Sequence, residues 1–345
     1  MIWKKEIKKV LEKTLLRMEG FPLSPFYSGI GHILIFHRIV PLHQRSTVGN
    51  MNIEITPEYF ELVIDFFRKK NYEFISLHDL PEHLQKKGRK FVIVTFDDGF
   101  KDVFTEAYPI LKKHQVPFTV YITTSFPDNK APVWGYVLEE ILKQNHRIEF
   151  MLNGNKHAFD CSTVEEKNTC WAKIRTIILH TSKSDYFSTL DQIFLPFTDG
   201  LYSKVLDMSM TWSQIRQLSQ DPLVTIGSHM VNHLRPKILS DDELLQEIEE
   251  SRRNIELHIN KKVSHFAFPY GGREEVGERE LALAESTGFD TIVTSRHANI
   301  FPGHINHLTR LPRIRVAEQD MERLRLFTLG IRPFFENGFK RIVTD

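Results

Sequence analysis

Short apolar runs rich in β-branched residues alternate along this chain with segments of helical periodicity. Residues 91–96, for example, read FVIVTF, as expected for a strand that is covered on both faces. Such alternation is typical of parallel strands joined by crossover helices. We therefore predict an α/β fold built on a parallel sheet or barrel of about seven or eight strands. The expected strands are residues 32–40, 72–77, 91–96, 117–123, 223–227, 265–270, 291–294 and 311–316.

The alternation stops between residues 127 and 210. Residues 147–159 look like a hairpin that turns at Asn153-Gly154, and helical segments rich in Lys, Glu and Ser surround it. We predict an inserted subdomain here, beside the mouth of the site. We predict three regions along the chain. Residues 1–30 form an amphipathic helix before the barrel, residues 31–316 form the barrel with its insertion, and residues 317–345 form a helical tail.

The N-terminal segment bears on location. Charges recur every few positions in residues 1–20, so these residues lack the apolar stretch of roughly 7 to 15 residues that a secretory signal needs. No apolar run elsewhere is long enough to span a bilayer. We expect a cytoplasmic protein. The apolar stripe of the N-terminal helix either docks on the barrel or makes a peripheral contact with a membrane surface.

Composition excludes several classes of protein. The chain has 45 Lys and Arg against 44 Asp and Glu, which argues against a nucleic-acid binder that works through bulk positive charge. With 41% apolar residues the chain can bury a core, so disorder is not expected. Its two cysteines are too few for a disulfide framework.

Two adjacent carboxylates end the apolar run at residues 91–96. Asp97 and Asp98 precede Gly99, and the carboxyl ends of parallel strands are where α/β proteins bind ligands. Adjacent residues on an extended chain point to different sides, so one carboxylate can ligate a metal while the other stays free as a base. An Asp-Asp-Gly turn with two solvated acids is the alternative.

Two histidines follow another predicted strand. His229 and His233 are four residues apart, and they face the same point if the loop makes one helical turn. Imidazole is a favoured zinc ligand, although a bare H-x-x-x-H pattern also arises by chance. Together with Asp98 these histidines would supply three protein ligands and leave room for a water, as open catalytic zinc sites do.

A turn rich in Pro and Gly ends a third predicted strand. Residues 266–272 read FAFPYGG. This pattern indicates either a core strand followed by a simple turn or a turn that orients a backbone N–H group into a cleft.

The combined motifs resemble those of the polysaccharide deacetylases of the NodB-homology type, carbohydrate esterase family 4. TFDDG matches residues 95–99, the family's histidine motif resembles the segment from His229, and the PYG element matches residues 269–271. The segment ILIFHRI also resembles the first strand of the exopolysaccharide-associated branch. The resemblance covers residues 33–316. It implies a distorted, incomplete (β/α) barrel of about seven strands.

The resemblance also implies a role for each matching residue. Asp98, His229 and His233 would hold a divalent metal, typically Zn²⁺, and Asp97 would act as the general base. The backbone N–H of Tyr270 would help the metal to stabilise the oxyanion of a tetrahedral intermediate.

Three further residues are expected at the substrate, which would be an N-acetylated glycan. Pro269 and Gly271 belong to the matched turn, and His37 lies near the end of the first predicted strand, where it can line the same mouth. A histidine satisfied within the end of the barrel is an equal alternative for His37.

Two departures from the family pattern concern the base and the acid. Many members have an arginine where this chain has Ala267, and Arg310 or Arg313 could replace it in orienting Asp97. The late histidine that serves as general acid in much of the family has no clear match. His304 and His307 are the closest candidates for that acid.

We predict a metal-dependent hydrolase that removes N-acetyl groups from N-acetylhexosamine units of a polysaccharide or glycan intermediate. Two other functions stay open. One is an enzyme of the same fold that acts on another C–N bond, such as a deformylase of a lipid-linked sugar or a cyclic-amide hydrolase. The other is an inactive glycan-binding protein, which the two departures favour and the intact acidic and histidine motifs oppose.

Overall fold

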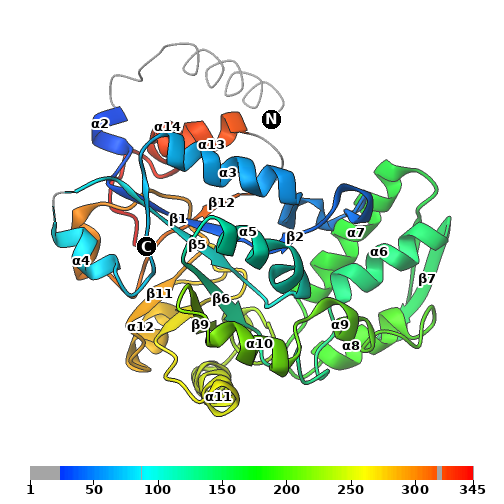
Figure 1. The fold of residues 1–345 in the computed structure, drawn as a ribbon. Coiled ribbons are helices and arrows are strands. Elements are labelled where there is room, and N and C mark those ends of the chain that lie inside the picture. The colour runs from blue at the N-terminus through cyan, green and yellow to red at the C-terminus, as the bar shows by residue number, and fades with distance from the viewer. Residues whose placement is uncertain (1–23, 87, 317–320, 345) are drawn as a thin grey trace.

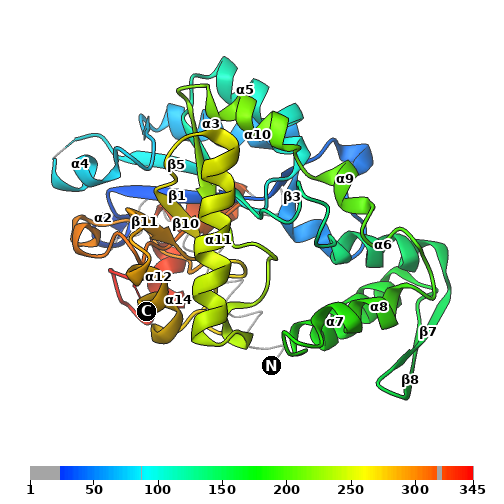
Figure 2. The same cartoon turned by 90° about the horizontal axis from the view of Figure 1, so that it is seen from below.

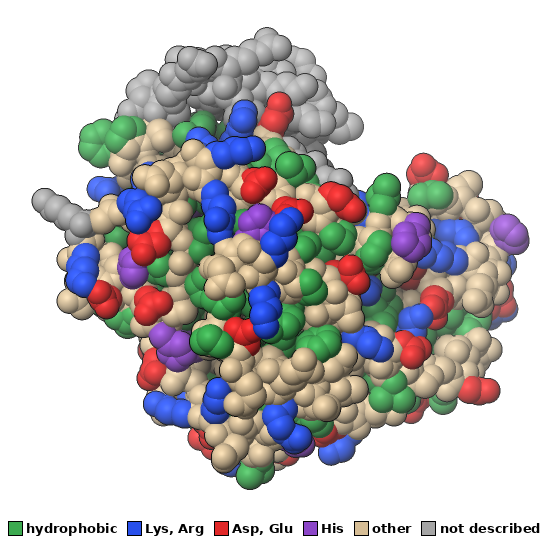
Figure 3. Space-filling view, viewed as in Figure 1, with side chains coloured by type: hydrophobic (Ala, Val, Ile, Leu, Met, Phe, Trp, Pro, Cys, Tyr) green, Lys and Arg blue, Asp and Glu red, His purple; other side chains and the backbone are tan. Residues whose placement is uncertain are grey.

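The computed structural model describes residues 24–86, 88–316 and 321–344. The amphipathic helix predicted over residues 1–30 therefore falls almost entirely outside the described residues. Within the described ranges, no helix is both long and apolar enough to cross a membrane. The molecular face in Figure 3 carries Lys and Arg side chains interspersed with Asp and Glu.

A parallel sheet forms the centre of the molecule (Figure 1). Its strands follow the order β11-β10-β9-β6-β5-β1-β12, and the short β4 adds to β5. Every pairing in this sheet is parallel, as the alternation predicted. The strands are β1 (Gly31–Phe36), β4 (Glu73–Phe74), β5 (Phe91–Phe96), β6 (Phe118–Ile122), β9 (Val224–Ser228), β10 (His265–Ala267), β11 (Thr291–Val293) and β12 (Ile314–Arg315).

The sheet curls until one segment reaches both of its edges. Leu311 bridges in parallel to Val293 of β11, and Ile314, three residues later, pairs with Leu34 of β1. Residues 311–315 thus connect the first strand of the chain with the last strands. The predicted distorted barrel is confirmed, and its closure depends on this short seam.

Helices pack on the outside of the curled sheet, with α3 and α11 on opposite sides of it (Figures 1 and 2). α3 shows how the sequence specifies them: Thr56 accepts a hydrogen bond from the N–H of Tyr59 as the N-cap, and Pro57 occupies the first turn. Its apolar face, which includes Phe60 and Phe67, is buried. The helices outside residues 127–210 are α2 (Ser24–Tyr27), α3 (Pro57–Lys69), α4 (Leu80–Gln85), α5 (Tyr108–Lys113), α10 (Trp212–Ser219), α11 (Asp241–Ile259), α12 (Glu278–Ser286), α13 (Met321–Thr328) and α14 (Ile331–Glu336).

Between β6 and β9 the chain leaves the sheet and forms a lobe at one side (Figure 1). The predicted hairpin within it is confirmed, because Leu152 pairs with Asn155 and both Asn153 and Gly154 have positive φ. The elements of this lobe are α6 (Trp134–Gln144), β7 (Arg147–Leu152), β8 (Asn155–Asp160), α7 (Val164–Leu179), α8 (Tyr186–Phe194) and α9 (Lys204–Met208).

The strand predicted over residues 32–40 is broken at His37. β1 ends at Phe36, and β2 (Arg38–Ile39) pairs with β3 (Glu54–Ile55) outside the main sheet. The N–H of Ile39 donates to Asp102 Oδ1 at 2.8 Å, which replaces the ladder bond that a continued strand would make. Hydrophobicity alone could not show this break, which places His37 at the C-terminal end of β1.

The tight packing between β6 and β9 yields a test of the fold. A methyl group on Gly227 would lie 2.4 Å from the ring of Tyr121, whereas one on Gly88 would meet nothing within 4 Å. We expect Gly227→Ala to lower the free energy of unfolding by about 1–3 kcal/mol through overpacking. Gly88→Ala should leave it nearly unchanged, as measured by urea denaturation. Equal stabilities of the two variants would contradict this packing.

Candidate active site

The acidic turn after β5 directs its two carboxylates to different partners. Asp98 has a left-handed backbone with φ of 74° and Gly99 one with φ of 82°, so the chain reverses immediately after the strand. Asp97 faces Arg313, and Asp98 faces His229 and His233. The side chains of both aspartates are almost fully buried.

Asp98, His229 and His233 bring three ligand atoms to one point. Asp98 Oδ1 lies 3.3 Å from His229 Nε2 and 3.0 Å from His233 Nε2. His229 Nδ1 lies 2.7 Å from the carbonyl oxygen of Ala267, and because that oxygen only accepts, Nδ1 carries a proton. This bond orients the ring so that Nε2 faces the carboxylate of Asp98.

This arrangement fits a cation. Asp98 Oδ1 is a buried oxygen that accepts no hydrogen bond of adequate geometry from the described residues. A positive ion between this oxygen and the two ring nitrogens would bind all three atoms at once. Two imidazoles and one carboxylate are the donor set of open catalytic zinc sites. Burial opposes ionisation of Asp98, but His233 and His229 hold its pKa well below the usual value.

The loop that carries His233 is held by α11. Glu247, buried on that helix, accepts hydrogen bonds from the N–H groups of Val231 and Asn232, both at 2.9 Å. These bonds support a loop in which Met230 and His233 both have positive φ. Glu247 is a positioning residue that sequence analysis missed, because an acid within a strongly charged helix looks like part of a solvated face.

Arg313 forms a buried, two-point ion pair with Asp97. Its Nη1 and Nη2 lie 2.7 and 2.8 Å from Asp97 Oδ1 and Oδ2, and its side chain is completely inaccessible. Nη1 also donates to Thr95 Oγ1 and Nε to the carbonyl of Thr294. Burial raises the pKa of Asp97. The charges of Arg313 and His229 together outweigh the effect of burial, so the pKa falls below its usual value. Asp97 is therefore a carboxylate near neutral pH.

The turn after β10 presents a backbone donor. Tyr270 and Gly271 have φ of 61° and 46°, and Ser295 holds them by donating from Oγ to the Tyr270 carbonyl and from N–H to the Gly271 carbonyl. Within the described residues the N–H of Tyr270 has no acceptor, which leaves it for a ligand. A side chain at position 271 would lie 2.8 Å from the N–H nitrogen of Ser295, so glycine is required there.

These residues surround a cavity of about 320 Å³ that is rich in aromatic rings. Asp97, Asp98 and the two histidines lie in its wall, and His37 and Arg315 line it from the ends of β1 and β12. The rings of Trp134 and Trp171, both from the lobe, stack 6.2 Å apart. The aromatic lining residues are Phe100, Phe126, Trp134, Tyr136, Trp171, Tyr186, Phe268 and Tyr270.

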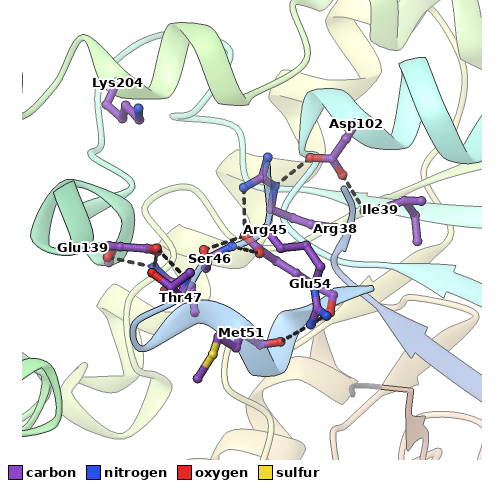
Figure 4. Close-up of polar contacts among 12 residues, drawn as sticks. Arg38, Ile39, Arg45, Ser46, Thr47, Met51, Glu54, Asp102, Glu139 and Lys204 are labelled. Carbon is purple, nitrogen blue, oxygen red and sulfur yellow. Dashed lines mark hydrogen bonds and ion pairs between the residues drawn. The ribbon is translucent and has the colours of Figure 1, made fainter. Parts of the chain in front are cut away.

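One wall of the cavity is the β2–β3 loop (residues 40–53), which Figure 4 shows within a polar network. Glu54 accepts hydrogen bonds from the backbone N–H and the hydroxyl of Ser46, and it also pairs with Arg38 at 3.1 Å. Glu139 of α6 accepts from the N–H of Thr47 at 3.0 Å. The network fastens this loop to the barrel and to the lobe, so both contribute to one rigid wall.

The sequence profile of the family described as polysaccharide deacetylase matches residues 84–170 and 181–292, which is more than half of the chain. The chain belongs to the polysaccharide deacetylase family. The match includes Asp97, Asp98, His229, His233 and the PYG turn, so the motifs that gave the resemblance lie within the matched region.

Solved structures share the fold. A Streptococcus pyogenes deacetylase, PplD, superposes with a TM-score of 0.55 at 18% identity over 86% of this chain and 97% of that one. IcaB from Ammonifex degensii superposes with a TM-score of 0.52 at 16% identity over 87% of this chain and 97% of that one.

Curated relatives match over shorter stretches. A poly-β-1,6-N-acetyl-D-glucosamine N-deacetylase of Staphylococcus aureus is 32% identical over 76 residues, which are 21% of this chain and 26% of that protein. The matched segments span 40% or less of the length of the curated relatives.

Several residues predicted at the site lie elsewhere. Arg310 does not reach Asp97, because its guanidinium pairs with Glu278 and Glu285 at the surface. His304 is fully buried with its ring against the backbone of Phe301, and neither His304 nor His307 lines the cavity. Pro269 and Gly271 shape the turn without lining the cavity, and Tyr270 between them does line it.

Arg313 and Arg310 lie in the same segment, so their variants can be compared to measure how much the buried ion pair with Asp97 contributes to stability. Arg313→Gln leaves the buried Asp97 without its partner, so we expect it to lower the free energy of unfolding by about 3–5 kcal/mol. Arg310→Gln removes a partly exposed pair and should cost only about 0–1 kcal/mol. Denaturant unfolding of both variants measures the difference. Similar costs would show that the Asp97 pair does not stabilise the closed barrel.

Proposed function

We propose that this protein is a metal-dependent hydrolase that removes N-acetyl groups from N-acetylhexosamine units of a glycan. The observation that carries the proposal is the ionised Asp97, held by Arg313, directly beside the convergent atoms of Asp98, His229 and His233. The activity named for the Staphylococcus aureus relative supports an amino sugar as substrate. Zinc is the cation that the donor set of two imidazoles and one carboxylate favours.

Each group of the site then has a defined task. A divalent cation, when bound by Asp98 and the two histidines, supplies a Lewis acid and lowers the pKa of water beside it toward about 7. Asp97 takes a proton from the attacking water, because Arg313 keeps its carboxylate ionised. The N–H of Tyr270 donates to the oxyanion that forms from the acetyl carbonyl. The aromatic walls hold the sugar and exclude bulk water.

The departing amine needs a proton, and His37 is placed to deliver it. Apart from His229 and His233, it is the only histidine among the described residues that lines the cavity. Burial lowers the pKa of His37 to about 4, against the opposing charges of Asp98 and Asp97. The ring is therefore neutral at pH 7, so it can deliver a proton only by relaying to the amine the one that Asp97 takes from the attacking water.

The arginine position bears on the alternative of an inactive binding protein. Ala267 leaves the family's usual position without a guanidinium, but Arg313 supplies one to Asp97 from the barrel seam. A base that is oriented and kept ionised serves catalysis, whereas binding alone does not require it. The structure thus removes one of the two reasons for expecting a loss of activity.

Substitutions of Asp97 and Asp98 should separate the loss of proton transfer from the loss of metal binding. We expect Asp97→Asn to lower acetate release from N-acetylglucosamine oligomers by about 10²–10⁴-fold while metal content stays near that of the wild type. Asp98→Asn should lower metal content itself. Acetate assays and metal analysis measure these effects, and circular dichroism checks the folding of both variants. Unchanged acetate release in Asp97→Asn would refute the mechanism, and release of formate in place of acetate from matched N-acyl sugars would indicate a deformylase.

A second pair of variants tests the proton donor. His37→Asn should lower kcat for acetate release by about 10²-fold or more, because the amine leaves without a positioned acid. The matched control is His307→Asn, a histidine outside the cavity, which should keep the wild-type rate. The idea fails if both variants retain full kcat.

A further inference from the structure

Two arginine side chains line the cavity without an acidic partner. Arg175 lies on α7 of the lobe, and Arg315 is the last residue of β12. Neither forms an ion pair or hydrogen bond with any residue that the structure describes, and Arg315 Nε is a buried donor with no acceptor. Because a buried donor without a partner is costly, such a group in a cavity is expected to meet a ligand.

The acids of the cavity wall are all engaged with other groups. Asp97 is paired with Arg313, and Asp98 faces the histidines. Glu275 accepts two hydrogen bonds from Arg235, at 2.7 and 2.9 Å. The wall therefore presents two guanidinium groups for which no carboxylate remains.

The two arginines also act on one another and on the reaction centre. Burial lowers the pKa of Arg315, and the charges of Arg323, Arg313 and Arg175 lower it further, against the opposing effect of Asp97. The charge of Arg175 thus reaches Arg315 although the two residues belong to different parts of the fold, and both line the same cavity. Like charges that converge on a partly enclosed space favour an anion there.

We propose that Arg175 and Arg315 form a subsite for an oxyanion carried by the N-acetylated sugar or by the residue attached to it. This inference rests on the proposed deacetylase function and specifies its substrate as an acidic glycan unit. A phosphate ester and a uronic acid carboxylate share the required chemistry, because the planar guanidinium binds either through two parallel hydrogen bonds.

Neighbouring residues fit this assignment. Trp171 precedes Arg175 by four residues on α7, so both project from the same face of the helix, and both line the cavity. A sugar ring against Trp171 would therefore place a substituent near Arg175. Because Arg175 belongs to the lobe and Arg315 to the barrel, an anion between them would link the two walls of the cavity.

The first experiment compares substrates that differ in charge. The metal-loaded protein is given methyl N-acetylglucosaminide, N-acetylglucosamine 1-phosphate, and a disaccharide of N-acetylglucosamine with glucuronic acid. We expect kcat/KM for acetate release to be at least about tenfold higher with one or both acidic substrates at low ionic strength, mainly through a lower KM. The better acidic substrate identifies phosphate or carboxylate. No preference for either one would overturn the subsite.

Variants of the two arginines connect that preference to the subsite. Arg175→Gln and Arg315→Gln should each reduce the ratio of acidic to neutral kcat/KM by about tenfold. Lys173→Gln is the matched control, because Lys173 is an exposed cation on the same helix that does not line the cavity. An unchanged ratio in both arginine variants, or an equal loss in the control, would contradict the proposal.

Binding of a product analogue separates this inference from the proposed activity. Glucosamine 1-phosphate has no acetyl group to lose, and calorimetry on the metal-loaded protein should show it binding at least about tenfold more tightly than methyl glucosaminide. Phosphate bound by the metal alone would survive in the arginine variants, whereas binding by the subsite would not. Arginine-dependent binding without deacetylation of any substrate would refute the proposed function only. Deacetylation with no preference for either acidic substrate, together with equal binding of both sugars, would refute the subsite only.

Discussion

The buried pair between Arg313 and Asp97 links the architecture of this protein to its chemistry. Arg313 lies in the seam where residues 311–315 join β11 to β1, and its guanidinium reaches the carboxylate at the end of β5. Both charges are removed from water, so each is tolerable only while the other is in place. The barrel must therefore close for Asp97 to be held ionised and oriented by Arg313.

Backbone strain is concentrated at the same edge of the sheet. Asp98, His233 and Tyr270 all adopt the left-handed region, which costs about 1–3 kcal/mol at a non-glycine residue. Hydrogen bonds from neighbouring elements hold these turns: Glu247 supports the histidine loop, and Ser295 supports the Tyr270 turn. The strain brings side chains from separate strands to one point, which regular strands ending in ordinary turns would not do.

Much of this arrangement could be predicted from the sequence, and the reasons for the remainder are physical. Apolar runs specified the parallel sheet, and the local motifs located Asp97, Asp98, His229 and His233, because strand ends converge at one edge. A choice between Arg310 and Arg313 needed the register of the seam, which depends on the pairing of Ile314 with Leu34 of β1, a strand near the other end of the chain. The sequence predicted His37 near the mouth of the site. Its proposed assignment as the proton donor, in place of His304 or His307, rests on the folded structure, in which His37 alone of the three lines the cavity.

The division between barrel and lobe separates chemistry from selectivity. The barrel supplies the candidate metal ligands, the proposed base and the proposed backbone donor from strand ends, where rigid elements fix them. The lobe supplies Trp134, Trp171 and Arg175 to the cavity, and the β2–β3 loop supplies Gly49, Asn50 and Ile53. Under the proposed function these residues would contact the part of the substrate away from the scissile bond. Because Glu139 ties that loop to the lobe, the two walls form one unit that can change its sugar preference without disturbing the ion pair beneath it. Under the two proposals, substrate choice should therefore depend on the lobe together with Arg315, and reactivity should depend on Arg313.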